Sequence, residues 1–138
     1  MKKNLIMALI CFFSVAVFGE ESPSIITNGL SAYEKSNIND GIEIWLKGSP
    51  LQNDDSTKKS IQEVMSKVEG AYGKIIGWEQ IRLIKFSPSF ERVYFLIKYE
   101  KGPLFATYDC YKPYNRWVIS AVDFNTKLQT ILPYAQPN

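Results

Sequence analysis

The sequence predicts an α+β domain in which N-terminal helices pack on a curved, cone-like antiparallel sheet of four to five strands. Two observations lead to this prediction. In the first half of the chain apolar residues recur every three or four positions, as on one face of a helix, and from Glu79 onward they recur every second position, as on one face of a strand. Helices followed by strands with short turns are typical of α+β domains.

Two short helices are expected between Ser24 and Lys47, with a bend where Asn and Gly interrupt the apolar pattern. Asp40 is placed to cap the second helix. A longer helix is expected from about Ser56, because a single apolar stripe continues along the next segment. The residues of that stripe are Ile61, Val64, Met65, Val68, Tyr72, Ile75 and Ile76.

The second half of the chain predicts four strands. Segments in which apolar residues stand at every second position are separated by turn-forming Ser, Pro, Gly and Asn residues. The expected strands are Gln80–Phe86, Glu91–Lys101, Pro103–Lys112 and Arg116–Phe124, and a short further piece is expected at Leu128–Leu132.

The sequence also predicts how the second and third expected strands pair with each other. A two-residue turn at Lys101-Gly102 would place Tyr99 opposite Leu104 and Phe95 opposite Tyr108. One face of the hairpin would then be apolar and cover the helices. The other face would be mixed and would hold a cluster of Arg92, Tyr94, Asp109 and Tyr111. This cluster is a candidate surface for a homodimer or a protein partner, and a solvated sheet face is the alternative.

Residues 1–19 have the pattern of an export signal. Lys2 and Lys3 precede an apolar stretch from Leu5 to Phe18, and small Gly19 comes before acidic Glu20. The stretch is shorter than the roughly 20 apolar residues that span a bilayer. We therefore expect cleavage near Gly19, a single domain over residues 20–138, and a protein that is periplasmic or secreted.

Cys11 raises lipid anchoring as an alternative. Bulky Ile10 precedes it, where a lipoprotein processing site has a small residue. Membrane anchoring is therefore not expected.

Composition excludes several classes of function. The chain has 16 basic and 14 acidic residues, and loss of Lys2 and Lys3 with the signal makes the two signs equal. A neutral domain with interspersed charges does not fit a nucleic-acid-binding protein. The chain contains no His, the commonest metal ligand and general base, so we expect no metal and no cofactor. Cys110 is expected to be a buried core residue rather than a nucleophile.

The order of elements resembles the cystatin-like and nuclear transport factor 2-like (ketosteroid isomerase-like) cone folds. The segments Gly102–Lys112, Arg116–Ile119 and Val122–Asn125 are also similar to a group of small exported bacterial proteins with this layout. The resemblance covers most of residues 24–133. It implies a sheet wrapped around the long helix and a pocket for a small apolar or amphipathic molecule at the open end. It implies no particular chemistry.

The side chains expected at such a pocket are Tyr99, Tyr108, Trp117 and Asp123. Alternation from Trp117 places Asp123 on the inward face near the end of a strand, where a carboxylate can bind a ligand hydroxyl or act as a base. The competing interpretation is that the aromatic residues only fill the core and that Asp123 only caps a turn or is turned outward by a bulge.

We find no catalytic motif in the sequence. The expected function is therefore a non-enzymatic binding or protein-interaction module, and the alternative is a small-molecule isomerase or lyase that uses Asp123 and a tyrosine. A deep pocket lined by Tyr108 and Trp117 would favour the enzyme. A filled interior with an exposed aromatic sheet face would favour the interaction module.

Overall fold

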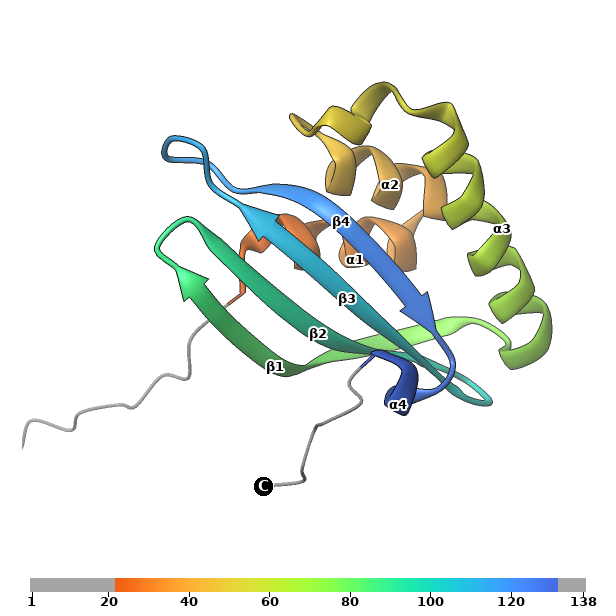
Figure 1. Ribbon diagram of the computed structural model, residues 1–138. Helices are drawn as coiled ribbons and strands as arrows, with labels where there is room; N and C mark the ends of the chain where they lie inside the picture. The colour runs from red at the N-terminus through yellow and green to blue at the C-terminus, as the bar shows by residue number, and fades with distance from the viewer. Residues whose placement is uncertain (1–21, 132–138) are drawn as a thin grey trace, which may run out of the picture.

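The computed structural model of the protein describes residues 22–131, so the predicted signal lies outside the described residues. The helical part comprises α1 (Ser24–Lys35), α2 (Ile38–Leu46), a short 3-10 helix η1 (Pro50–Asn53) and α3 (Asp55–Tyr72). The strands are β1 (Ile75–Ser87), β2 (Phe90–Tyr99), β3 (Pro103–Tyr111) and β4 (Val118–Asn125), and α4 (Leu128–Ile131) follows them. The strands form one antiparallel sheet in the order β1-β2-β3-β4 (Figure 1). The predicted α+β class is confirmed.

Helices α1 and α2 cover one face of the sheet, and this arrangement differs from the one implied by the resemblance. Helix α1 contacts β1 and α2 contacts β4, while the long helix α3 lies at the flank beside α2 (Figure 1). The sheet is thus packed mainly on the two short helices rather than wrapped around the long one. Among residues 22–131, no helix combines the length and the apolar character needed to cross a membrane.

Two helix boundaries differ from the prediction. Asn37, not Asp40, caps α2, because its side chain accepts a hydrogen bond from the backbone N–H of Asp40 at 3.0 Å. Helix α3 ends at Tyr72 and does not include Ile75 and Ile76. Gly73 follows with φ of 84°, a left-handed conformation that glycine adopts without steric cost and that stops the helix.

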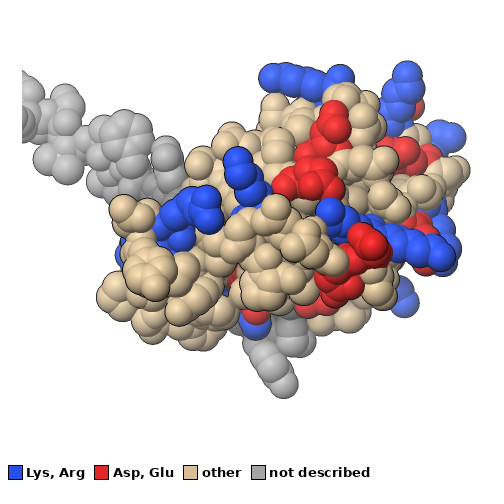
Figure 2. All heavy atoms as spheres, turned by 90° about the horizontal axis from the view of Figure 1, so that it is seen from above, with Lys and Arg blue, Asp and Glu red and all other residues tan. Residues whose placement is uncertain are grey.

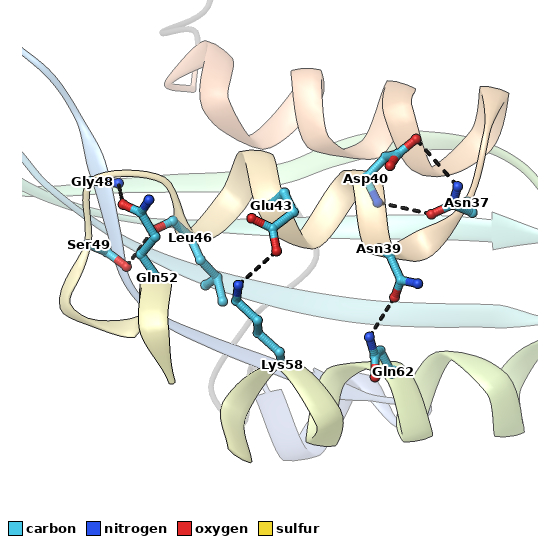
Figure 3. A network of polar contacts seen from close by, with 10 residues as sticks. All are labelled: Asn37, Asn39, Asp40, Glu43, Leu46, Gly48, Ser49, Gln52, Lys58 and Gln62. Atoms are coloured by element: carbon cyan, nitrogen blue, oxygen red, sulfur yellow. Dashed lines mark hydrogen bonds and ion pairs between the residues drawn. The ribbon is translucent and has the colours of Figure 1, made fainter. Parts of the chain in front are cut away.

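Polar side chains join α2 to α3 across their exposed sides (Figure 3). Lys58 Nζ lies 2.7 Å from Glu43 Oε1, and Gln62 Nε2 donates to Asn39 Oδ1 at 2.6 Å. The exposed ion pair and the exposed hydrogen bond each contribute at most about 1 kcal/mol. They orient α3 on α2, and the buried stripe of Ile61, Met65 and Val68 supplies the apolar contact.

Trp45 occupies the centre of the core. Its ring is fully buried and lies 5.6 Å from the ring of Tyr108 and 6.0 Å from that of Phe124, measured between centroids. Its indole Nε1 donates to the Ile26 carbonyl at 3.0 Å. A Cβ at Gly29 would overlap this indole, so α1 reaches Trp45 only because position 29 has no side chain.

The β2–β3 register differs from the predicted one by two residues. Phe95 lies opposite Ala106 and Ile97 opposite Leu104, because the last β2–β3 pair is Lys98 with Pro103 and four residues separate the two. The backbone N–H of Glu100 donates to Lys74 O and that of Lys101 to Tyr72 O, at 3.1 and 2.8 Å, which holds this loop against the end of α3. A shift of two residues leaves every side chain on its predicted face, so the segregation of apolar and mixed faces is confirmed.

A bulge in β4 overturns the predicted orientation of Asp123. Cys110 pairs with Ile119 but Asp109 pairs with Ala121, so Ser120 is an extra residue on β4 and the residues after it change face. Asp123 pairs with Thr107 on the outer face and is exposed. The predicted strand piece at Leu128–Leu132 is also wrong, because the described part of this segment is the helical turn α4.

The close approach of α1 to Trp45 leads to a stability prediction. Gly29→Ala should lower the free energy of unfolding by about 1–3 kcal/mol, because the new methyl group overpacks the core. Gly70→Ala is the matched control: nothing lies within 4 Å of a Cβ at position 70 in α3, and this variant should gain about 0.5–1 kcal/mol. Urea unfolding of both variants measures the difference. Equal stability of the two would contradict the packing described.

Candidate functional site

Tyr108 fills the space in which the resemblance places a pocket. It is fully buried on the inner face of β3, and the ring of Phe95 meets it edge-on at 5.9 Å. Trp45 and Phe124 pack on it as well. The Tyr108 hydroxyl has no hydrogen-bond partner among the described residues, and burial raises the pKa of this phenol well above its usual value. The residue is a core filler with an unsatisfied hydroxyl.

Tyr99 belongs to a buried chain of hydrogen bonds that the sequence did not predict. The Tyr33 hydroxyl donates to Glu69 Oε1 at 2.5 Å and lies 3.1 Å from the Tyr99 hydroxyl, which has Met65 Sδ as a second acceptor at 3.4 Å. Burial is the main cause that raises the pKa of Tyr99 to about 12. Burial and then the bond to Glu69 raise the pKa of Tyr33. Both phenols are therefore neutral and are satisfied by each other and by Glu69.

A cleft of about 650 Å³ adjoins this chain, at the end of the molecule where the β2–β3 loop lies. Its walls carry three carboxylates, from Glu34, Glu69 and Glu100, together with Lys74. Glu69 and Glu100 already accept hydrogen bonds, from Tyr33 and from the backbone of Lys74. Within residues 22–131, no cluster of three or more Asp, Glu or Cys side chains is arranged to hold a metal. Two of the three carboxylates in the cleft, Glu69 and Glu100, therefore have structural partners.

Trp117 lines a different groove, at the opposite end of the molecule. This groove has a volume of about 650 Å³ and lies between the start of α1, the end of α2 and the β3–β4 loop. Its apolar residues include Ile25, Ile44 and Trp117. The Trp117 ring is partly buried, and Lys112 Nζ lies 4.9 Å from its centroid in a cation–π contact.

Positive charge surrounds the groove. Lys47 and Arg116 line it, and neither forms an ion pair with any described residue. The first turn of α1 adds to this potential, because it contains no acidic residue and has no side-chain cap. Arg116 is held against Gly48, whose φ of 77° and missing side chain leave room for the guanidinium. The groove thus combines apolar side chains with two exposed cations, an arrangement suited to an anionic amphipathic ligand.

The predicted outer-face cluster is present but is internally paired. Arg92 and Asp109 are direct cross-strand partners, and Arg92 Nε and Nη2 donate to the two Asp109 oxygens at 2.6 and 2.9 Å. The bond to Asp109 raises the pKa of Arg92. Tyr94 is buried, so Tyr111 is the member with a large exposed surface. The cluster offers an aromatic ring but no free charge.

Asp123 lies on this outer face, on the other side of the sheet from Tyr108. With Arg92, Thr107 and Thr130 it lines a small hollow of about 320 Å³ under α4. The expected pocket therefore does not form from Tyr99, Tyr108, Trp117 and Asp123.

Cys110 is fully buried as predicted, and burial raises the pKa of its thiol to about 12. The thiol is therefore protonated and unreactive at neutral pH.

Sequence reasoning identified Trp117 but missed the other groove residues. Ile25 and Ile44 were not singled out, and Lys47 and Arg116 were named only as the ends of expected elements. The useful signal was the absence of any acidic residue from both the first turn of α1 and the segment 110–120.

Comparison of the chain with protein-family models, curated proteins and solved structures gives no match. The resemblance to cone folds stays a prediction.

The two buried tyrosines should respond differently to removal of their hydroxyls. Tyr99→Phe should lower the free energy of unfolding by about 1 kcal/mol, because a buried hydrogen bond is lost. Tyr108→Phe should leave it unchanged or raise it by about 1 kcal/mol, because the unsatisfied hydroxyl disappears. Chemical unfolding followed by circular dichroism measures both. A larger loss in Tyr108→Phe than in Tyr99→Phe would show that the Tyr108 hydroxyl has a partner.

Proposed function

We propose that this protein is an exported, non-enzymatic binding module whose groove beside Trp117 takes an anionic amphipathic ligand or partner segment. One observation carries the proposal. The interior position of Tyr108 is filled, whereas the surface groove of about 650 Å³ at Trp117 combines apolar walls with two cations that have no described ion-pair partner. Export rests on the signal-like pattern of residues 1–19.

The lining residues define the chemistry of the ligand. Ile25, Ile44 and the Trp117 ring favour an alkyl chain or an aromatic ring, since such surfaces gain free energy when water is removed. Lys47 and Arg116 favour a carboxylate, sulfonate or phosphate head group, and charge-assisted hydrogen bonds of this kind are about twice as strong as neutral ones. Two Asn side chains in the lining can orient the polar part of the ligand.

The enzymatic alternative has no geometric support. It requires Asp123 and a tyrosine to act on one ligand, but Asp123 and Tyr108 lie on opposite faces of the sheet. Glu69 does contact a tyrosine, and it accepts a hydrogen bond from the buried, neutral phenol of Tyr33. That contact satisfies a buried hydroxyl, and we assign it a structural role.

Binding of anilinonaphthalene sulfonate, an anionic aromatic probe, tests the groove. Lys47→Gln and Arg116→Gln should each weaken the binding by about tenfold, because each removes one charge-assisted contact. Uncharged anilinonaphthalene should bind more weakly and should not distinguish the variants. Fluorescence titration of the full chain measures the affinities.

Lys67→Gln and Lys101→Gln are the matched controls for this titration. Both residues are exposed cations away from the groove, on α3 and in the β2–β3 loop. All variants contain residues 1–21, so any binding of the probe to that segment contributes equally to each titration. The proposal fails if the groove variants and the control variants bind the probe equally well.

A further inference from the structure

Strand β1 forms an edge of the sheet, and among the described residues it pairs only with β2. The other edge strand, β4, is contacted by α2 (Figure 1). Strand β1 has 13 residues and contains no proline. It is thus longer than the roughly 5–6 residues typical of strands, and its free edge can accept a further strand. Seen from above in Figure 2, the side of the molecule where η1 and the start of α3 lie instead carries interspersed basic and acidic side chains.

Three large apolar side chains are exposed on this edge strand. Ile76 is 54% exposed, Ile81 40% and Phe86 60%. Each one falls at a bulge, where β1 has one residue more than β2. A long edge strand with exposed apolar side chains is a template for pairing with another chain. Strand β1 therefore has the properties of an interaction edge.

The bulge at Ile81 decides which side chains β1 presents together. Glu79 pairs with Leu96 and Arg82 pairs with Tyr94, and these two β2 residues lie on the same, outer face of the sheet. Glu79 and Arg82 therefore also share the outer face. In a regular strand two residues at this separation would point to opposite faces.

We propose that the protein forms a symmetric dimer in which the β1 strands of two copies pair antiparallel, with Glu79 of each copy opposite Arg82 of the other. The two-fold axis then passes between Gln80 and Ile81, so the bulge lies at the centre and a regular stretch of strand lies on each side of it. A two-fold contact is isologous, so the Glu79–Arg82 pair occurs twice. The two antiparallel sheets join into one continuous sheet.

The charges of β1 fit this pairing. Arg82 forms no ion pair with a described residue. Glu79 Oε1 lies 3.3 Å from Lys98 Nζ, but the Glu79 side chain is 62% exposed, so its second oxygen can accept from Arg82 of the second copy. Opposite charges on directly opposed residues stabilise a strand pair.

The apolar side chains fit the same register. Trp78 lies opposite Leu83 of the second copy, and both residues are partly buried on the helix-covered face. Ile84 lies opposite Gly77, where nothing in the same copy lies within 4 Å of a Cβ. A change of register by one residue would bring Trp78 opposite Ile84, which is on the other face. Because the strand is complementary to itself in this register, a second copy is the occupant that fits it.

A charge swap tests the dimer in the full chain. Arg82→Glu and Glu79→Arg should each raise the dissociation constant of the dimer by about tenfold, because the symmetric contact loses two ion pairs and gains two repulsions. The double variant Glu79→Arg with Arg82→Glu restores opposite charges across the axis, and it should return the dissociation constant to within about twofold of the original. Sedimentation velocity over a range of protein concentrations measures all three.

Lys101→Glu is the matched control, because it makes the same change in net charge at an exposed position in the β2–β3 loop. It should leave the dissociation constant unchanged, and circular dichroism confirms that each variant is folded. All the proteins contain residues 1–21 and 132–138, so association through those segments is equal in each.

Three outcomes overturn the proposal: a monomer at every concentration, equal dissociation constants for Arg82→Glu and Lys101→Glu, or a double variant that does not recover. A monomer would assign the edge to a strand of another protein or to another segment of this chain. Lys47 and Arg116 lie outside the pairing, so failure here leaves the groove proposal standing.

Discussion

The insertion of Trp45 between α1 and the sheet is the contact on which most of this structure depends. Its indole bonds to the Ile26 carbonyl, contacts the bare backbone of Gly29, and packs against Tyr108 and Phe124. One side chain therefore joins α1, α2, β3 and β4. Burial of a ring of this size contributes several kcal/mol. Helix α3, although the longest, is attached at the flank and adds polar bridges to α2.

The filled core has a direct consequence for function. Because Trp45 and Tyr108 occupy the space beneath the sheet, the binding site proposed for this protein lies at its surface. The two ends of the molecule, along the direction of the strands, carry different charged side chains. At the end with the β1–β2 and β3–β4 connections, the groove beside Trp117 carries two cations, Lys47 and Arg116, with no described ion-pair partner. At the other end, the carboxylates of Glu69 and Glu100 are used to satisfy a buried hydroxyl and the backbone.

The elements with one strong periodic signal could be predicted from the sequence. Both short helices, the long helix and the two faces of the β2–β3 hairpin follow from which positions are apolar, and a register shift of two residues does not change a face. The features that were missed depend on single residues and on tertiary contacts. The positive φ of Gly73 ends α3, and the extra residue Ser120 turns Asp123 outward. The groove is assembled from segments 23–28, 44–47 and 115–117, whose proximity no local pattern reveals.

Fluorotryptophan NMR of the full chain tests most directly whether ligands bind outside a filled core. The chain contains 3 Trp residues, and Trp117→Phe assigns the resonance of the groove residue. On titration with dodecanoate, an anionic amphiphile, the Trp117 resonance should move in a saturable way, while that of Trp45 should stay in place. A shift of the Trp45 resonance without a shift of Trp117 would contradict the account, because the ligand would then enter the space that Tyr108 and Phe124 are described as filling.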